Sequence, residues 1–433
     1  MTSRRAIIVL ALAASVVLLV AAIVWDPAGS ETEEAAAPGT GLKVVVLAVD
    51  GLDWFILGEY MEAGMLPNLS RIMRSALAVE VEADVPTVPH AGWTMVARGA
   101  PLTEQERAKL ESSAGARLFG VAPDIVRLVR NAGCDAVAIG WPAAWPTSEE
   151  GIAAPYTPSS PDHVGSLAPA FFATAPGQTG DAELETTIRN AVEKNVATID
   201  EEFEARIHAG GCGEGAGDAL AAVKWGYLAD RIALDVAGRT IAEREPDLAL
   251  VYLGGLDAAT HRFLAPAMPD YFEGVDFGMA DCDDVVPNYY TFIDEAIGRL
   301  LRLHVDGTLF VVTSAYGTHP SVNHLPATGS HELGPPGVMA VRGPHLMGSE
   351  KTPSVRTTDF APTILAALGL PTPGDLPGRV VEEALPMHTL ELFPTALVDR
   401  EEPAATSEQA PPECDQMEEM VRERLSGLRT AGR

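Results

Sequence analysis

The stretch LKVVVLAVDG, residues 42–51, decides the fold class of this chain. Its apolar residues, most of them valines, follow one another without polar alternation. That pattern is typical of a strand that is buried on both faces of a parallel sheet. The run ends on Asp50 and Gly51, a pair that favours a tight turn. The segment therefore predicts a buried parallel strand with an aspartate at its carboxyl end.

Similar apolar runs recur along the chain and predict three more buried strands, at 135–140, 247–255 and 308–317. Helical patterns separate the strands and cover residues 66–76, 124–133, 217–243 and 290–303. Strands that alternate with helices are typical of a mostly parallel sheet wrapped on both faces. We therefore expect an α/β fold with helices on both faces of such a sheet.

Other segments do not follow this alternation of strands and helices. Residues 26–41 are acidic and rich in small residues, which predicts a flexible linker. A Pro-, Gly-, Ser- and Thr-rich stretch begins at residue 147, and we interpret it as the start of a cap inserted at about 147–245. The main domain is then expected to span 42–385. Residues 386–433 are predicted to be a disordered tail that ends in a short helix.

The amino-terminal segment predicts membrane attachment. Residues 6–24 read AIIVLALAASVVLLVAAIV, an uncharged run of about the ~20 residues that a membrane helix needs. Arg4 and Arg5 precede this run, so the positive-inside rule places the rest of the chain outside the cytoplasm. We favour a retained signal-anchor over residues 1–25. A cleaved signal peptide is the alternative, although no clean cleavage site follows the run.

Charge and cysteines limit the partners further. The formal net charge of −30 argues against nucleic acid, because phosphate-backbone binding needs a basic surface. A phosphate ester would have to be held by a local metal ion or by backbone N–H groups. The four cysteines, Cys134, Cys212, Cys282 and Cys414, form no C-x-x-C pair. A single disulfide and isolated thiols both remain open.

Chemically active side chains gather where predicted strands end, which is where open parallel sheets bind ligands. Asp50 follows the first strand, Asp257 and His261 follow the third, and His331 lies in a loop after the fourth. One aspartate and two histidines are ligands suited to Zn²⁺. Each residue also has a plain structural interpretation: Asp50 as a turn residue, Asp257 as a helix cap and His261 as a surface residue.

Five segments, in this order along about 42–385, resemble the phosphodiesterase and nucleotide pyrophosphatase branch of the alkaline phosphatase superfamily. They are VVVLAVDGLDW (44–54), MLPNLSRIMRSA (65–76), IGWPAAWP (139–146), YLGGLDAATHRF (252–263) and TTDFAPTILAALGLPTPGDLPGR (357–379). The resemblance implies an alkaline phosphatase-like fold and a metal-dependent hydrolase of phosphate esters or diesters.

The resemblance also implies two zinc-like ions. One ion would be held by Asp257, His261 and His331, and all three ligands are present. The other would be held by Asp50, by an Asp-His pair before a glycine, and by the nucleophile. The Asp-His pair should fall at Ala315 and Tyr316, so both of these ligand positions are degraded.

The nucleophile position departs from the family in the same way. Family members often read P-T-V-T before a helix, with the last threonine as nucleophile, whereas residues 86–99 here read PTVPHAGWTMVARG. Without gaps, the nucleophile position is Pro89, which has no hydroxyl group but is well suited to the first turn of a helix. A shift of register would bring in Thr87 or His90 instead.

Three functions are therefore open. The chain could be a phosphoric ester or diester hydrolase that uses one Zn²⁺ ion, or a pseudoenzyme that binds a ligand or partner, or a scaffold without metal. The expected partners are a small phosphorylated molecule and, through the amino-terminal helix, a membrane. The expected location is the bacterial inner membrane, with a single span and the globular domain in the periplasm or outside the cell.

Overall fold

A computed structural model describes residues 40–75, 77–111, 124–142, 144, 152–153, 179–207, 211–213, 216–275, 279–303, 307–324, 327–346, 354–387, 389–392 and 397–398. All of these residues belong to one compact unit. The apolar segment 6–24, the tail helix and almost all of the linker lie outside them. Within the described part of the chain, no helix is long and apolar enough to cross a bilayer.

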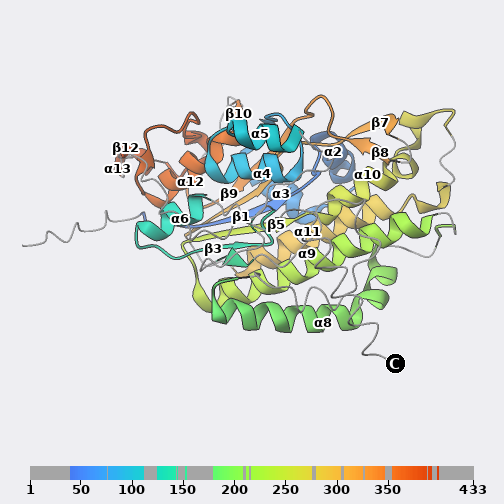
Figure 1. Ribbon diagram of the computed structural model, residues 1–433, viewed down its shortest axis with the longest axis horizontal. Helices are drawn as coiled ribbons and strands as arrows, with labels where there is room; N and C mark the ends of the chain where they lie inside the picture. Colours follow the sequence, from blue (N-terminus) through green and yellow to red (C-terminus); the bar gives the residue numbers. More distant parts are fainter. Residues whose placement is uncertain are drawn as a thin grey trace, which may run out of the picture. The chain divides into compact units, whose positions relative to one another are not determined.

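An eight-stranded sheet in the order β10-β2-β9-β6-β1-β5-β3-β4 forms the centre of the described structure (Figure 1). Its strands are β1 (Lys43–Val49), β2 (Leu77–Glu82), β3 (Ala136–Ile139), β4 (Ile152–Ala153), β5 (Leu248–Leu253), β6 (Thr308–Thr313), β9 (Gly337–Arg342) and β10 (Val355–Arg356). Strand β9 is antiparallel to its neighbours β6 and β2, and the other pairs are parallel. The predicted α/β fold with a mostly parallel sheet is confirmed.

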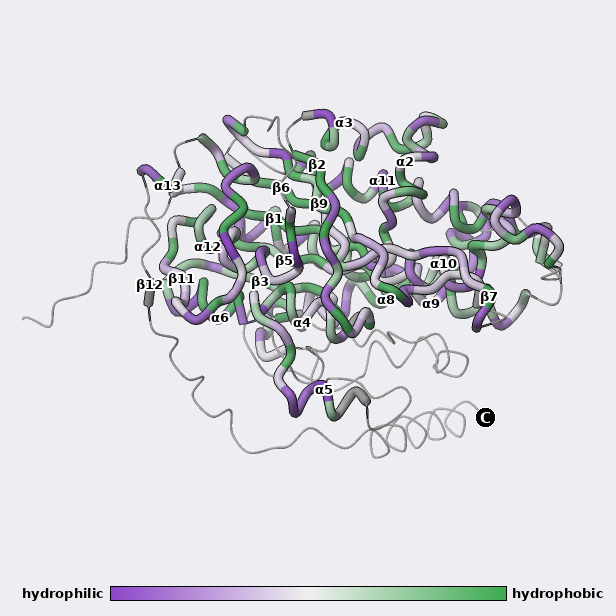
Figure 2. Tube along the Cα trace, turned by 90° about the horizontal axis from the view of Figure 1, so that it is seen from above, coloured by the Kyte–Doolittle hydropathy of each residue, from purple (hydrophilic) through white to green (hydrophobic). Residues whose placement is uncertain are grey.

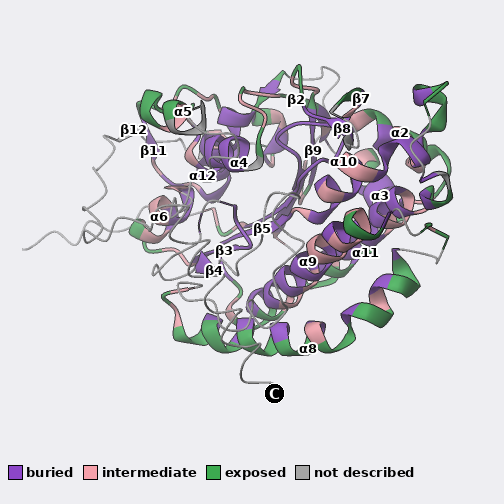
Figure 3. Cartoon of the chain, turned by 45° about the vertical axis from the view of Figure 1, so that its right-hand side comes forward, coloured by how far each residue is buried: buried purple, intermediate pink, exposed green. Residues whose placement is uncertain are grey.

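Helices cover both faces of this sheet because β1 sends apolar side chains in both directions. Val45, Leu47 and Val49 enter one core, together with α2 (Trp54–Glu62), α3 (Pro67–Ser75), α8 (Ala182–Arg206), α9 (Gly217–Arg244), α10 (Gly255–Ala267) and α11 (Val285–Leu303). Val44, Val46 and Ala48 enter the other core, together with α4 (Pro89–Arg98), α6 (Asp124–Asn131) and α12 (Phe360–Leu368). Apolar residues follow the central strands in Figure 2, and the helix faces toward the sheet are buried in Figure 3.

Smaller elements complete the described chain. They are α5 (Glu104–Glu111), η3 (Pro269–Phe272), η4 (Ala280–Cys282), η5 (Thr357–Asp359), η6 (Glu382–Ala384), α13 (Thr389–Leu392), the antiparallel pair β7 (His319–His324) and β8 (Ala327–Ser330), and the pair β11 (Thr372–Pro373) and β12 (Leu397–Val398).

The turn after β1 brings the first strand against α10. Gly51 has a φ of +73°, a backbone conformation that favours glycine. A Cβ atom added at Gly51 would lie 2.9 Å from the Cα atom of Asp257. Glycine is therefore needed here both for the turn and for the close approach that sets Asp50 beside the start of α10.

The segment interpreted as the start of a cap contains a long helix, α8, which packs against α9. Helix α9 in turn packs against β5. The division of the chain into anchor, linker, main domain with inserted cap, and tail stays a prediction. A disulfide joins Cys212, in the connection between α8 and α9, to Cys282 in η4, whereas Cys134 is a free thiol. Of the two possibilities that the cysteine spacing left open, a single disulfide or isolated thiols, the structure therefore shows a disulfide.

Candidate metal centre

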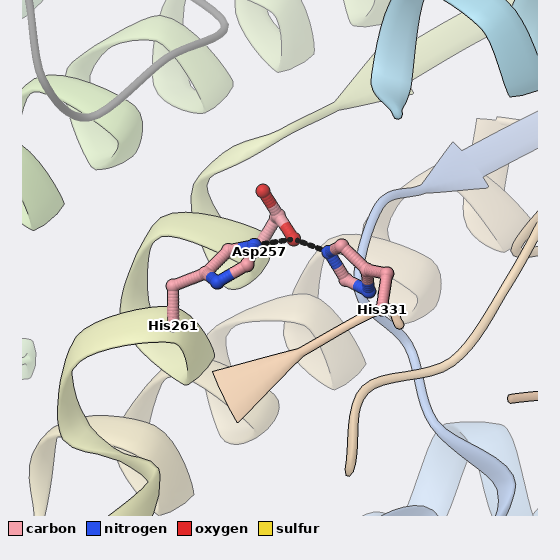
Figure 4. Close-up of side chains that lie close together, drawn as sticks. All are labelled: Asp257, His261 and His331. Carbon is pink, nitrogen blue, oxygen red and sulfur yellow. Dashed lines mark hydrogen bonds and ion pairs between the residues drawn. The ribbon is translucent and has the colours of Figure 1, made fainter. Parts of the chain in front are cut away.

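Three predicted ligands come together at the carboxyl end of β5. Asp257 and His261 lie one helical turn apart in α10, which begins directly after β5, and His331 follows β8. The candidate ligand atoms of Asp257, His261 and His331 all lie within 4.8 Å of one another. Both imidazole rings point toward the carboxylate (Figure 4): the Nε2 atoms of His331 and His261 lie 2.6 Å and 3.4 Å from Asp257 Oδ1.

Backbone carbonyl groups fix the orientation of both rings. His261 Nδ1 lies 2.8 Å from the carbonyl oxygen of Gly329, and His331 Nδ1 lies 2.7 Å from that of Gly317. Because a carbonyl oxygen can only accept, each Nδ1 must carry a proton. The two Nε2 atoms are then the ones that meet the carboxylate or a metal ion. Metal-binding histidines are commonly oriented by such a hydrogen bond from the second ring nitrogen.

A cation at this site needs the carboxylate ionised and both imidazoles neutral. Burial raises the pKa of Asp257, but the neighbouring imidazoles of His261 and His331 outweigh this and lower it to about 2. Burial lowers the pKa of His261. Burial would also lower the pKa of His331, but the Asp257 carboxylate raises it to about 8. The site thus offers one carboxylate and two imidazoles, and the His261 side chain, 24% exposed, gives it contact with solvent.

Asp50 lies in a different environment. It is completely buried, its Oδ2 accepts a 2.7 Å hydrogen bond from the Tyr252 hydroxyl, and its Oδ1 has no partner. Burial and then the Asp257 carboxylate raise the pKa of Asp50 to about 7. The Trp93 indole N–H and the Tyr316 hydroxyl face the same carboxylate without reaching hydrogen-bond geometry. Aromatic hydrogen-bond donors thus surround Asp50.

The positions predicted as degraded ligands are filled by packed side chains. Ala315 and Tyr316 are both fully buried, and the Tyr316 ring centroid lies 4.5 Å from that of His331. A Cβ atom at Gly92 in α4 would lie 2.9 Å from Tyr316 Cε1 and 3.3 Å from Ala315 Cβ. The two side chains therefore occupy the space between His331 and α4. Among the described residues, only Asp257, His261 and His331 form a group of three that could hold an ion.

The candidate nucleophile segment leads into α4. Val88 is the residue before the helix and Pro89 is its first residue, so the prediction that proline opens a helix here is confirmed. The Thr87 hydroxyl donates a 2.9 Å hydrogen bond to the backbone carbonyl of His331. It is thus engaged by the backbone of the loop that carries His331.

Sequence reasoning missed Asp230, which holds the start of the ligand-bearing helix. This buried α9 residue accepts hydrogen bonds from Gly254 N at 2.9 Å, Gly255 N at 3.1 Å and the Tyr289 hydroxyl at 2.9 Å. A side chain at Gly255 would collide with the Tyr289 hydroxyl. The only sequence signal was that Asp230 is one of two aspartates inside the largely apolar stretch YLADRIALDVA, residues 227–237.

Comparisons with known proteins agree with the predicted family. The family model described as type I phosphodiesterase / nucleotide pyrophosphatase matches residues 99–328. None of the curated proteins compared with the chain matches it.

Several solved structures are similar at low sequence identity. Wild-type alkaline phosphatase PafA is 12% identical with a TM-score of 0.48, and the match covers 79% of this chain and 98% of PafA. A phosphonate monoester hydrolase from Silicibacter pomeroyi is 15% identical with a TM-score of 0.42, covering 83% of this chain and 78% of the hydrolase. Phosphonoacetate hydrolase from Sinorhizobium meliloti is 14% identical with a TM-score of 0.36. In that match 64% of this chain is covered and only 57% of the hydrolase. The family model covers more than half of the residues, and the chain belongs to the type I phosphodiesterase / nucleotide pyrophosphatase family.

Proposed function

We propose that this chain is an extracytoplasmic family member that binds one Zn²⁺ ion and hydrolyses phosphate esters or diesters without a covalent phosphoryl-enzyme intermediate. The observation that carries the proposal is the convergence of two imidazole Nε2 atoms on one carboxylate oxygen, with both Nδ1 atoms held by backbone carbonyls.

Two imidazole nitrogens and one carboxylate oxygen form a ligand set that occurs in catalytic zinc sites. A zinc ion with three protein ligands supplies Lewis-acid chemistry and an open fourth position for water or substrate. The protein residues would hold and orient the ion. Asp257 supplies the negative charge, the carbonyls of Gly317 and Gly329 hold the rings, and His261 lies on the side open to solvent.

The surroundings of Asp50 do not fit the second ion that the family implies. Burial raises the pKa of Tyr252 and Tyr316 well above the usual value, so both phenols stay neutral donors. The Trp93 indole nitrogen is a donor only and cannot bind a metal ion. One carboxylate among such donors is a buried hydrogen-bond acceptor, so we derive no catalytic step from a second ion.

A pseudoenzyme is the second candidate, and a specific observation favours it. Asp50, Tyr316 and Trp93 have no exposed surface, so the half of the site that would hold the second ion is closed. Pro89 offers no hydroxyl, and the Thr87 hydroxyl is bonded to the His331 carbonyl. A protein with this site could bind a phosphorylated ligand at the zinc ion without turning it over.

The location and partners belong to the same proposal. The Cys212–Cys282 disulfide supports an oxidising compartment. The apolar run 6–24 after Arg4 and Arg5 supports a single-pass anchor in a bacterial inner membrane. The globular domain would then lie in the periplasm or outside the cell, with a small phosphorylated molecule as ligand. The net charge of −30 argues against nucleic acid.

The test is zinc-dependent hydrolysis of an activated aryl phosphodiester by the full chain in nanodiscs. Turnover that is lost in the His261→Ala variant supports the one-metal hydrolase. Zinc bound at full occupancy without turnover of any monoester or diester supports the pseudoenzyme. If zinc neither binds nor raises the melting temperature, both candidates are wrong.

A further inference from the structure

Several large apolar side chains that are exposed to solvent lie on segments at the end of the sheet where the candidate metal centre lies. Nine such residues occur among the described residues, and three of them are Val275, Leu303 and Met387. The other six lie on α2, η3 and β7 and on the loops that follow β2 and β8: Phe55, Tyr271, Val322, Val85, Val88 and Leu333. Single exposed apolar residues are ordinary, but a concentration of them indicates an interaction surface.

Leu333, Val85 and Val88 flank the site on the His331 side. Leu333 follows His331 by two residues, is 99% exposed, and has a φ of +67°, which is uncommon for a leucine. A Cβ atom at Gly334 would lie 3.8 Å from Thr87 Cγ2, and the Thr87 hydroxyl bonds to the His331 carbonyl. The loop with Leu333 therefore lies against the segment that contains Val85 and Val88.

Phe55, Tyr271 and Val322 form a second group, on α2, η3 and β7. The rings of Phe55 and Tyr271 pack edge to face with centroids 5.8 Å apart, and both are about half exposed. Strand β7, which carries Val322, contacts η3. The elements α2, β7, β8 and α10 lie together in Figures 1 and 3.

A chain of hydrogen bonds connects this second group to the metal centre. Phe55 lies in the first turn of α2, and Asp53, which caps that helix, accepts a 3.3 Å hydrogen bond from the backbone N–H of Thr318. The preceding residue, Gly317, provides the carbonyl that holds His331. Asp53 thus links the start of α2 to the loop segment that holds His331.

We propose that these six residues bind the organic part of the ester, and that the substrate is a phosphate ester of an apolar alcohol. This inference rests on the proposed function, because the metal centre would hold the phosphoryl group. An apolar alcohol gains from leaving water at such a surface. A nucleotide would bring extra negative charge to a chain whose net charge is already −30.

The test uses methyl, propyl and hexyl phosphonate as stable ligands of the zinc-loaded full chain in nanodiscs, measured by isothermal titration calorimetry. We expect each added methylene to gain half of the free energy of complete burial, which raises the affinity about twofold. The affinity for hexyl phosphonate should then exceed that for methyl phosphonate on the order of 30-fold. The Leu333→Ser variant should reduce this ratio severalfold. The matched control is Leu303→Ser, because Leu303 is an exposed apolar residue at the end of α11. This variant should leave the ratio of hexyl to methyl affinity unchanged.

The outcomes separate this inference from the proposed function. Zinc-dependent binding with equal affinity for all three phosphonates overturns the apolar-alcohol assignment and leaves the one-metal site standing. Tighter binding of adenosine monophosphate than of hexyl phosphonate also overturns it. If no phosphonate binds in a zinc-dependent way, both proposals fail. If affinity rises with chain length, phosphatidic acid can then be added to the nanodisc bilayer. Weaker binding of hexyl phosphonate in its presence identifies the substrate as a bilayer lipid, and unchanged binding identifies it as a soluble alkyl ester.

Discussion

Two glycine carbonyls determine the direction of the imidazole rings at the candidate metal centre. A Cβ atom at Gly329 would lie 2.6 Å from the Thr260 carbonyl oxygen, and one at Gly317 would lie 2.7 Å from that of Pro336. Side chains are therefore excluded at the positions that hold His261 and His331. The geometry of the site depends on close backbone packing as much as on the ligands themselves.

The raised pKa of His331 predicts that zinc binding depends on pH. In the metal-free protein, protonated His331 bonds to the Asp257 carboxylate, and zinc must displace that proton. Because the pKa is about 8, zinc affinity should rise about tenfold per pH unit up to pH 8 and then level off. Competition with a zinc-sensitive dye between pH 6 and 9 measures this. A flat profile would contradict the ligand role of His331.

The stability of the metal-free protein should change in the opposite direction. The pKa of His331 is raised from 6.5, so the protonated residue stabilises the fold fully below pH 6.5, and this contribution is lost as the pH rises through 8. The melting temperature of the metal-free chain is therefore expected to fall over this range. His331→Gln should remove that part of the pH dependence.

Asp230 is expected to position the zinc ligands. Asp230→Asn weakens the hydrogen bonds at the start of α10, and we expect a loss on the order of 10-fold in metal affinity, the low end of the effect of contacts that support ligands. Zinc titration measures the effect. Asp294→Asn is the matched control: Asp294 is equally buried and accepts from the backbone N–H groups of Asn68 and Leu69 at the start of α3.

The two variants should lose similar stability, and only Asp230→Asn should lose zinc affinity. An equal change in zinc affinity in both variants would mean that Asp230 acts through global stability alone.

At the scale of elements, the start of α4 argues against a covalent mechanism, because Pro89 opens the helix and Thr87 is bonded to the His331 backbone. Thr87→Val should lower the free energy of unfolding by about 1 kcal/mol through the lost hydrogen bond. The rate of hydrolysis by the Thr87→Val variant should stay within about threefold of the wild-type rate, because the proposed mechanism transfers no phosphoryl group to Thr87. Detection of phosphothreonine at residue 87 by mass spectrometry during turnover would refute this.

The elements that the sequence predicted and those it missed differ for physical reasons. The strands β1, β3, β5 and β6 are continuous apolar runs because both of their faces are buried. Strand β2 was missed because glutamates at its exposed positions interrupt the apolar run, and the β7–β8 pair because most of its residues are polar or small. Helix α8 was hidden in a stretch interpreted as cap, although its buried residues recur at helical spacing.

The site was predicted in part. The four-residue spacing and the family resemblance led to Asp257, His261 and His331. The carbonyls that hold the rings, and Asp230, depend on contacts between segments far apart in the chain, which a single sequence does not contain. The packing of Tyr316 between His331 and α4 depends on Gly92, and no motif connects these two positions.

For the whole molecule, the Cys212–Cys282 disulfide closes a loop with a sequence separation of 70 residues. Loop-closure entropy for that length predicts a loss of about 4 kcal/mol in the free energy of unfolding when both cysteines are replaced by alanine. Denaturant unfolding measures the loss. The free thiol Cys134 provides the control, since Cys134→Ala should have a much smaller effect. Equal stability of the double variant and the wild type under oxidising conditions would contradict the pairing.

The number of metal ions per chain tests the account most directly. Elemental analysis of the zinc-saturated full chain, after removal of loosely bound metal, should give one zinc ion per chain, and the His261→Ala variant should give none. A second ion that is lost in the Asp50→Asn variant would show that Asp50 is still a metal ligand. That result would contradict the proposal that the half of the site around Asp50, Tyr316 and Trp93 holds no ion.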